Sequence, residues 1–203
     1  MRIGNKNRRG FTLIELIIGM AMFGIIAVVI TSFEAQFEKI TLFINQSIEN
    51  RQGFDSVFQS LRTEIRSAGS SAIGGYTIES ATSTSFVFFS DVDGDGVTER
   101  IRYTITPSST LERGFIDPSG SPLTYATSSE TKQSVITNVV ATSSSFQYYD
   151  SNYSGTQNPM SYPIDVSLIR MVKITVTADV NPTASPLPVT FSHTINIRNL
   201  RTN

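Results

Sequence analysis

FTLIELIIGMAMFGIIAVVITSF, residues 11–33, is an apolar segment with one charged residue, Glu15, at its fifth position. A helix of about 20 residues crosses the roughly 30 Å hydrocarbon layer of a bilayer, so this segment is long enough to span a membrane. A carboxylate inside that layer costs a few kcal/mol on insertion scales and normally has a partner. We therefore expect another group to compensate Glu15.

The residues ahead of this segment are basic. Residues 1–10, MRIGNKNRRG, include four basic residues and no acidic one. Such a flank predicts that the N-terminus stays on the cytoplasmic side of the membrane. A secretory signal would end in an Ala-x-Ala-like cleavage site, and residues 27–33 (AVVITSF) offer none. On these features alone the segment is an uncleaved signal anchor, an interpretation that leaves Glu15 unexplained.

The stretch RRG-FTLIEL at residues 8–16 resembles the type III signal of the type IV pilin superfamily, with a basic leader, a Gly, a Phe and a Glu five residues after the Gly. The resemblance implies that a prepilin peptidase cuts between Gly10 and Phe11 and that Phe11 becomes N-methylated. It also implies that Glu15 pairs, during assembly, with the Phe11 amine of a neighbouring subunit. A freed α-amine is cationic near neutral pH, so this pairing would compensate the carboxylate.

Length and composition fit one membrane anchor followed by one domain. The chain has 203 residues, 16 of them basic and 17 acidic, and no Cys. Without residues 1–10 it keeps 12 basic residues against 17 acidic ones, a net charge of −5. No basic patch that would indicate a nucleic-acid partner is evident. The lack of Cys excludes a disulfide or a thiolate metal site, whereas many major pilins close a C-terminal loop with a disulfide.

Apolar residues continue at helical spacing beyond residue 33, in steps of three and four. This stripe predicts an amphipathic helix that stops before Gly69. Its members are Phe33, Phe37, Ile40, Ile44, Ile48, Phe54, Phe58, Leu61 and Ile65.

After Gly69 the chain is rich in Ser, Thr, Gly and short β-prone runs. Ile101, Tyr103 and Ile105 alternate with polar residues, which is typical of an antiparallel sheet with one buried face. An amphipathic helix can cover that face, so we expect an α+β head in which the helix packs on an antiparallel sheet. The expected strands are 76–80, 84–90, 100–106, 135–141, 145–150, 167–178 and 188–198. The expected loops are 106–133, 151–165 and 179–188.

The predicted organisation therefore has four parts. They are a leader (1–10), a transmembrane or filament-core half of the helix (11–33), an amphipathic half (34–68) and a β-sheet head (69–203). The order of elements in the head also resembles that of PilW/GspJ-type minor pilins. That resemblance implies a subunit that primes assembly or caps a filament tip.

DVDGDGVTE, residues 91–99, is an acidic loop between two expected strands. Asp91, Asp93 and Asp95 alternate as at the start of an EF-hand loop, where carboxylates converge on Ca²⁺. Glu99 would have to replace the bidentate Glu of that loop, because the twelfth position here is Arg102. Two interpretations stay open: a hairpin loop whose Asp and Gly residues supply turn geometry, and a weak structural calcium site formed by Asp91, Asp93, Asp95 and Glu99.

These features favour a structural subunit over an enzyme. No G-x-S-x-G nucleophile motif is present, and His193 falls on the apolar side of an expected strand. We expect no catalytic residues and no required cofactor. The partners would be a prepilin peptidase, other pilin subunits and the cytoplasmic membrane, from which the processed chain enters an extracellular or periplasmic filament. The alternatives are a type II secretion pseudopilin and an anchored adhesion domain that is never polymerised.

Overall fold

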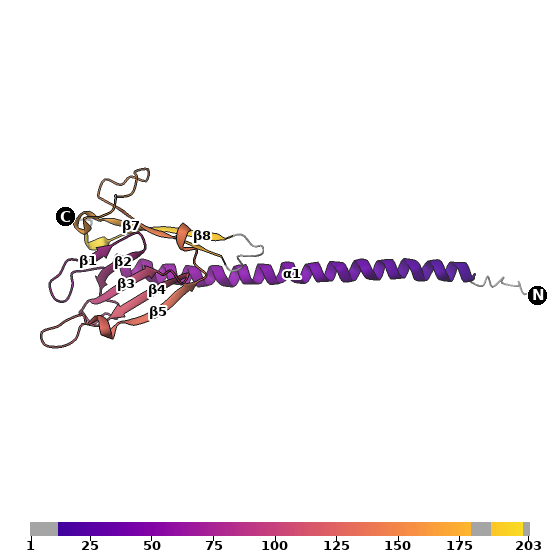
Figure 1. The fold of residues 1–203 in the computed structure, drawn as a ribbon, viewed down its shortest axis with the longest axis horizontal. Helices are drawn as coiled ribbons and strands as arrows, with labels where there is room; N and C mark the ends of the chain where they lie inside the picture. The colour runs from indigo at the N-terminus through magenta and orange to yellow at the C-terminus, as the bar shows by residue number, and fades with distance from the viewer. Residues whose placement is uncertain (1–11, 180–187, 201–203) are drawn as a thin grey trace, which may run out of the picture. The chain divides into compact units, whose positions relative to one another are not determined.

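The computed structural model describes residues 12–179 and 188–200, with the backbone alone described over residues 35–52 (Figure 1). Within these residues there is one α-helix, α1, which spans Leu13–Arg66. The chain divides into two compact units, Met1–Glu49 and Asn50–Asn203. The boundary between the units falls within residues 34–68, the predicted amphipathic half of the helix. The part of α1 that follows the boundary supplies core residues to the head.

The head contains two antiparallel sheets. In the five-stranded sheet, neighbours in sequence are neighbours in space, in the order β1-β2-β3-β4-β5. The three-stranded sheet has the order β6-β7-β8. The strands are β1 (Ile78–Ala81), β2 (Ser85–Ser90), β3 (Glu99–Ile105), β4 (Thr110–Ile116), β5 (Thr131–Thr137), β6 (Ser145–Tyr149), β7 (Met171–Ala178) and β8 (Val189–Asn196).

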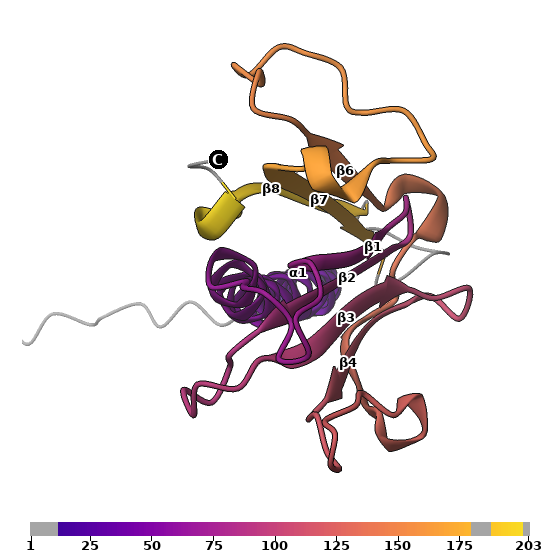
Figure 2. The same cartoon turned by 90° about the vertical axis from the view of Figure 1, so that its left-hand side faces the viewer.

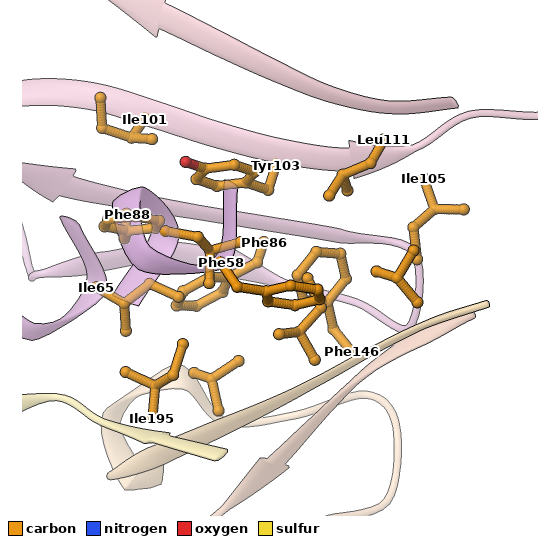
Figure 3. Packing of buried hydrophobic residues seen from close by; sticks show 14 of the residues in the cluster. Phe58, Ile65, Phe86, Phe88, Ile101, Tyr103, Ile105, Leu111, Phe146 and Ile195 are labelled. Carbon is orange, nitrogen blue, oxygen red and sulfur yellow. The ribbon is translucent and has the colours of Figure 1, made fainter. Parts of the chain in front are cut away.

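The C-terminal part of α1 lies between the two sheets (Figure 2). Towards the three-stranded sheet, the ring of Phe54 stacks on Phe191 at 4.3 Å between centroids. On the other side, the carboxylate of Glu64 accepts a hydrogen bond from the hydroxyl of Tyr103 on β3. One hydrophobic core therefore includes residues from the helix and from both sheets (Figure 3).

The helical stripe is confirmed where the structure describes it in the head. Phe54, Phe58, Leu61 and Ile65 are all buried. Their spacing places them on one side of α1, facing the core. The members of the stripe between residues 35 and 52 lie outside the described side chains. The predicted α+β class, with a long N-terminal helix and an antiparallel sheet, is also confirmed.

Two details of the expected head were wrong. The strands form two sheets rather than one, and the helix packs between them. The segment 106–133, expected to be a loop, contains β4 and the start of β5. Packing a second sheet against this core removes more apolar surface from water than a single sheet would.

The strand β4 was missed because one of its inward positions is charged. Leu111 and Phe115 pair with inward residues of β3, and Arg113 stands between them, opposite Tyr103. Arginine at an inward position breaks the apolar alternation that marks a strand. The structure tolerates it because the Arg113 guanidinium forms an ion pair with Glu64 of α1, at 2.8 Å between Nη2 and Oε1.

The opposite face of this sheet is held by ion pairs. Arg102 on β3 contacts Glu112 and Glu130, each at 2.7 Å. Gly114 on β4 lies beneath this group, and a β-carbon there would overlap the Glu130 carboxylate. Glycine at this position therefore gives Glu130 room to lie across the sheet and reach Arg102.

Candidate functional site

The first turn of α1 contains a reciprocal pair formed by Thr12 and Glu15. The backbone N–H of Glu15 donates to Thr12 Oγ1 at 3.4 Å, and the backbone N–H of Thr12 donates to Glu15 Oε2 at 3.5 Å. This is the pattern of a capping box, which satisfies N–H groups that have no partner within the helix. In a membrane no water is available for those groups, so the cap matters more there than at a surface.

The T-x-x-E spacing of residues 12–15 was a sequence signal for this cap, and the sequence interpretation did not use it. The cap gives Glu15 a second role beside its predicted pairing with a Phe11 amine. Its carboxylate also lies close to the positive end of the helix dipole, where an anion is favoured. Gly10 and Phe11, the predicted processing residues, lie outside the described residues.

The first unit exposes a membrane-length apolar helix. Leu13–Glu34 has a mean hydropathy of 2.7, and none of its most apolar window is buried. Its large apolar side chains are at least half exposed, among them Leu13, Phe23 and Phe33. Such a surface requires lipid or other apolar helices around it. Length and composition thus fit the predicted membrane-spanning half of the helix.

The acidic loop between β2 and β3 brings its four carboxylates together. One ligand oxygen from each of Asp91, Asp93, Asp95 and Glu99 can be chosen so that all lie within 4.8 Å of one another. Oxygen donors of this kind are what Ca²⁺ prefers. Arg102, the twelfth residue of the loop pattern, points to the outer face of the sheet and binds Glu112 and Glu130 instead.

The same carboxylates also hold the loop through its own backbone. Asp91 accepts hydrogen bonds from the N–H groups of Gly94 and Gly96, which have φ values of 80° and 87°. These positive values favour glycine, as in the predicted turn. Glu99 Oε2 accepts from the N–H of Val92 at 2.8 Å. The loop geometry thus agrees with the hairpin interpretation, and calcium binding stays a prediction.

Glu99 is the buried member of this cluster. Burial raises the pKa of its carboxyl group, and the charges of Asp93 and Asp91 raise it further. Its residue is 1% exposed, whereas Asp93 and Asp95 are exposed. Burial therefore disfavours the charged form of Glu99, and the hydrogen bond from the Val92 N–H offsets part of this effect.

A buried polar group in the head escaped sequence reasoning. Glu64 accepts a hydrogen bond of 2.7 Å from the Tyr103 hydroxyl and hydrogen bonds from Arg113. Burial and the neighbouring Glu64 charge raise the pKa of Tyr103, so its hydroxyl stays protonated and can donate. Tyr103 and Arg113 pair across neighbouring strands, but Glu64 lies 39 and 49 residues before them, and only the topology brings it to them. The group links the helix to the five-stranded sheet.

These features define a protein with one N-terminal helix suited to a membrane and an α+β head. Residues 5–31 match the family model described as the prokaryotic N-terminal methylation motif. This motif is the prepilin signal of type IV pilins and pseudopilins, as the sequence resemblance implied. No curated protein and no solved structure matches the chain. The motif and the apolar helix together indicate membrane anchoring.

Proposed function

We propose that this chain is a structural, non-enzymatic minor subunit of a type IV pilus or a related filament. The match of residues 5–31 to the methylation motif carries this proposal. It is supported by Glu15, which lies in the first turn of an exposed apolar helix, where a neighbouring subunit has access to it. The order of elements in the head, similar to that of PilW/GspJ-type subunits, favours a minor role.

In the proposed pathway, the chain is inserted with residues 1–10 in the cytoplasm. A prepilin peptidase cuts between Gly10 and Phe11 and methylates the new amine. The helix then leaves the lipid and joins a bundle of like helices, where the Glu15 carboxylate pairs with the Phe11 amine of a neighbour. Both charges would then be removed from lipid together, which lowers the cost of burying either one.

Intact-mass measurement and N-terminal sequencing of chain isolated from membranes of its native host test the processing step. We expect a mass that lacks residues 1–10 and carries one added methyl group, with N-methylphenylalanine as the first residue. A retained leader would overturn the proposal and favour the signal-anchor interpretation. A chain carrying Gly10→Leu should keep its leader while it still enters the membrane.

A type II secretion pseudopilin carries the same signal and is the second candidate. The two are separated by where the processed chain is found. Recovery of the chain in filaments sheared from the cell surface supports a pilus subunit. Retention in the envelope, together with loss of protein secretion when the chain is deleted, supports a pseudopilin.

A further inference from the structure

A polar pocket of about 530 Å³ lies beside the C-terminal turns of α1 and the strand β8. Three of its lining residues are arginines, and none is acidic. Arg62 and Arg66 come from α1, and Arg198 follows β8. The pocket is lined by Arg62, Arg66, Thr194, Ile195, Asn196 and Arg198.

The three arginines have no carboxylate partner among the described residues. The ion pairs found there involve other cations, Arg100, Arg102, Arg113 and Lys132. Arg62 makes one side-chain contact, between its Nη2 and Nδ1 of His193 at 3.1 Å. Because the guanidinium can only donate, His193 Nδ1 accepts this hydrogen bond. The contact therefore orients Arg62 without neutralising its charge.

The helix dipole explains only part of this arrangement. A cation in the last turn of a helix is favourable, and Arg66 occupies the last turn of α1. However, Arg62 lies one turn earlier on the same side, and like charges four residues apart repel. Arg198 comes from a different element and adds a third positive charge to the same pocket. A bound anion would relieve this repulsion.

We propose that this pocket binds a phosphate group. Guanidinium groups present planar sets of N–H donors that match phosphate oxygens, and three of them suit the several oxygens of a tetrahedral phosphate better than the two of a single carboxylate. Thr194 and Asn196 can supply neutral donors at the same rim. The volume exceeds that of one phosphate, so it leaves room for the group that carries it, such as glycerol in a lipid headgroup or a phosphorylated sugar.

The proposal concerns the head alone and does not depend on filament assembly. It is tested with the full chain in alkyl maltoside micelles, which contain no phosphate. Glycerol phosphate is titrated by calorimetry, with sodium chloride at matched ionic strength as the blank. In a second arm, the micelles contain phosphatidylglycerol, and phosphatidylcholine serves as the comparison lipid. Binding in the first arm alone identifies a soluble phosphate ester, and binding in the second identifies a lipid headgroup.

We expect saturable binding in at least one arm. The triple variant Arg62→Gln, Arg66→Gln, Arg198→Gln should weaken it by about tenfold or more, a loss of at least about 1.4 kcal/mol. Two single variants that each remove one positive charge are then compared: Arg66→Gln in the pocket, and Lys132→Gln as its matched control. Lys132 lies on β5, in the other sheet, with its side chain 56% exposed. Only Arg66→Gln should weaken binding.

Circular dichroism of each variant establishes that its head is folded before binding is compared. Absence of saturable binding in both arms overturns the proposal. Equal affinity of the triple variant and the unmodified chain also overturns it, because the arginines would then play no part. Binding of acetate as tight as that of glycerol phosphate would show a carboxylate site instead.

Discussion

At the scale of single residues, the head contains a mostly buried charge that the sequence pattern does not predict, that of Arg113. Arg113 sits at an inward position of β4 and is held by Glu64 and by the face of the Phe115 ring, 5.3 Å from its guanidinium carbon. The Glu64 partner cannot be predicted from local sequence, because Glu64 lies 49 residues earlier in the chain. Each side chain would be costly to bury without the other.

The substitution Glu64→Gln should therefore destabilise the head strongly. It keeps an acceptor for the Tyr103 hydroxyl but leaves the Arg113 charge unpaired in a mostly buried place. The side chains of Glu64 and Arg113 are 10% and 19% exposed. We therefore expect the free energy of unfolding to fall by about 3 kcal/mol, the lower end of the range for removing one partner of a buried ion pair. Denaturant unfolding of the full chain in micelles, followed by near-ultraviolet circular dichroism, measures it.

The matched control is Glu112→Gln, which removes one of two carboxylates from Arg102 on the outer face of the same sheet. Arg102 keeps Glu130, and the Glu112 side chain is 23% exposed against 10% for Glu64, so a loss below about 1 kcal/mol is expected. Equal losses for the two variants would mean that the inner pair has no special role. Adding Arg113→Met to Glu64→Gln should recover part of the lost stability, since an apolar pair needs no counter-charge.

At the scale of elements, the sequence was most informative where side chains repeat regularly. The buried residues Ile101, Tyr103 and Ile105 of β3 follow the predicted alternation, and Val172, Ile174 and Val176 of β7 are buried at the same spacing. In such strands the alternation of apolar and polar residues predicts which side chains are buried. Strands pair with their neighbours in sequence, but the packing of α1 and the two sheets around one core depends on contacts between distant residues, and no local pattern contains that information.

The loop between β2 and β3 makes a pH prediction. The pKa of Glu99 is raised in the folded chain, so folding favours its protonated form. The contribution of Glu99 to stability must then increase as pH falls through its folded pKa, and it levels off below the ordinary value of 4.5. Comparison with Glu99→Gln isolates this effect, because the variant keeps the other titrating groups.

We subtract the unfolding free energy of Glu99→Gln from that of the unmodified chain, and we expect this difference to increase as the pH falls from 7 to 4.5. Denaturant unfolding across this range measures it, and a flat difference would contradict the burial argument. Repeating the pH 7 measurement with millimolar calcium separates the two interpretations of the loop. Stabilisation by calcium that Glu99→Gln reduces supports the metal site, and an unchanged midpoint supports the hairpin turn.

At the scale of the whole molecule, the two units differ in how much of their structure the sequence alone predicts. In the first unit, Met1–Glu49, length and hydropathy predict the helix, and the motif at residues 5–31 predicts its processing signal and the place of Glu15. In the head, composition predicts the class but not the arginine pocket, because Arg198 and the arginines of α1 meet only after folding. In the first unit, the structure adds a feature that the sequence interpretation did not include, the helix cap formed by Thr12 and Glu15.

The cap allows the assembly role of Glu15 to be tested separately from its structural role. Glutamine also serves in a capping box, so Glu15→Gln keeps the start of the helix and removes only the charge. Glu15→Val removes both. If pairing with a neighbour's amine drives assembly, both variants should be cleaved after Gly10 and both should fall in sheared filaments by about tenfold or more, equivalent to about 1.4 kcal/mol.

Immunoblots of the filament and membrane fractions, with intact mass as the check on cleavage, measure this outcome in the native host. Glu34→Gln is the matched control, since Glu34 lies at the other end of the same apolar span and should tolerate the change. Normal incorporation of Glu15→Gln with loss of Glu15→Val would assign Glu15 to the helix cap alone. Loss of both by about tenfold or more would show that the carboxylate acts between subunits, because the helix dipole alone favours Glu over Gln by only about 0.3–1 kcal/mol.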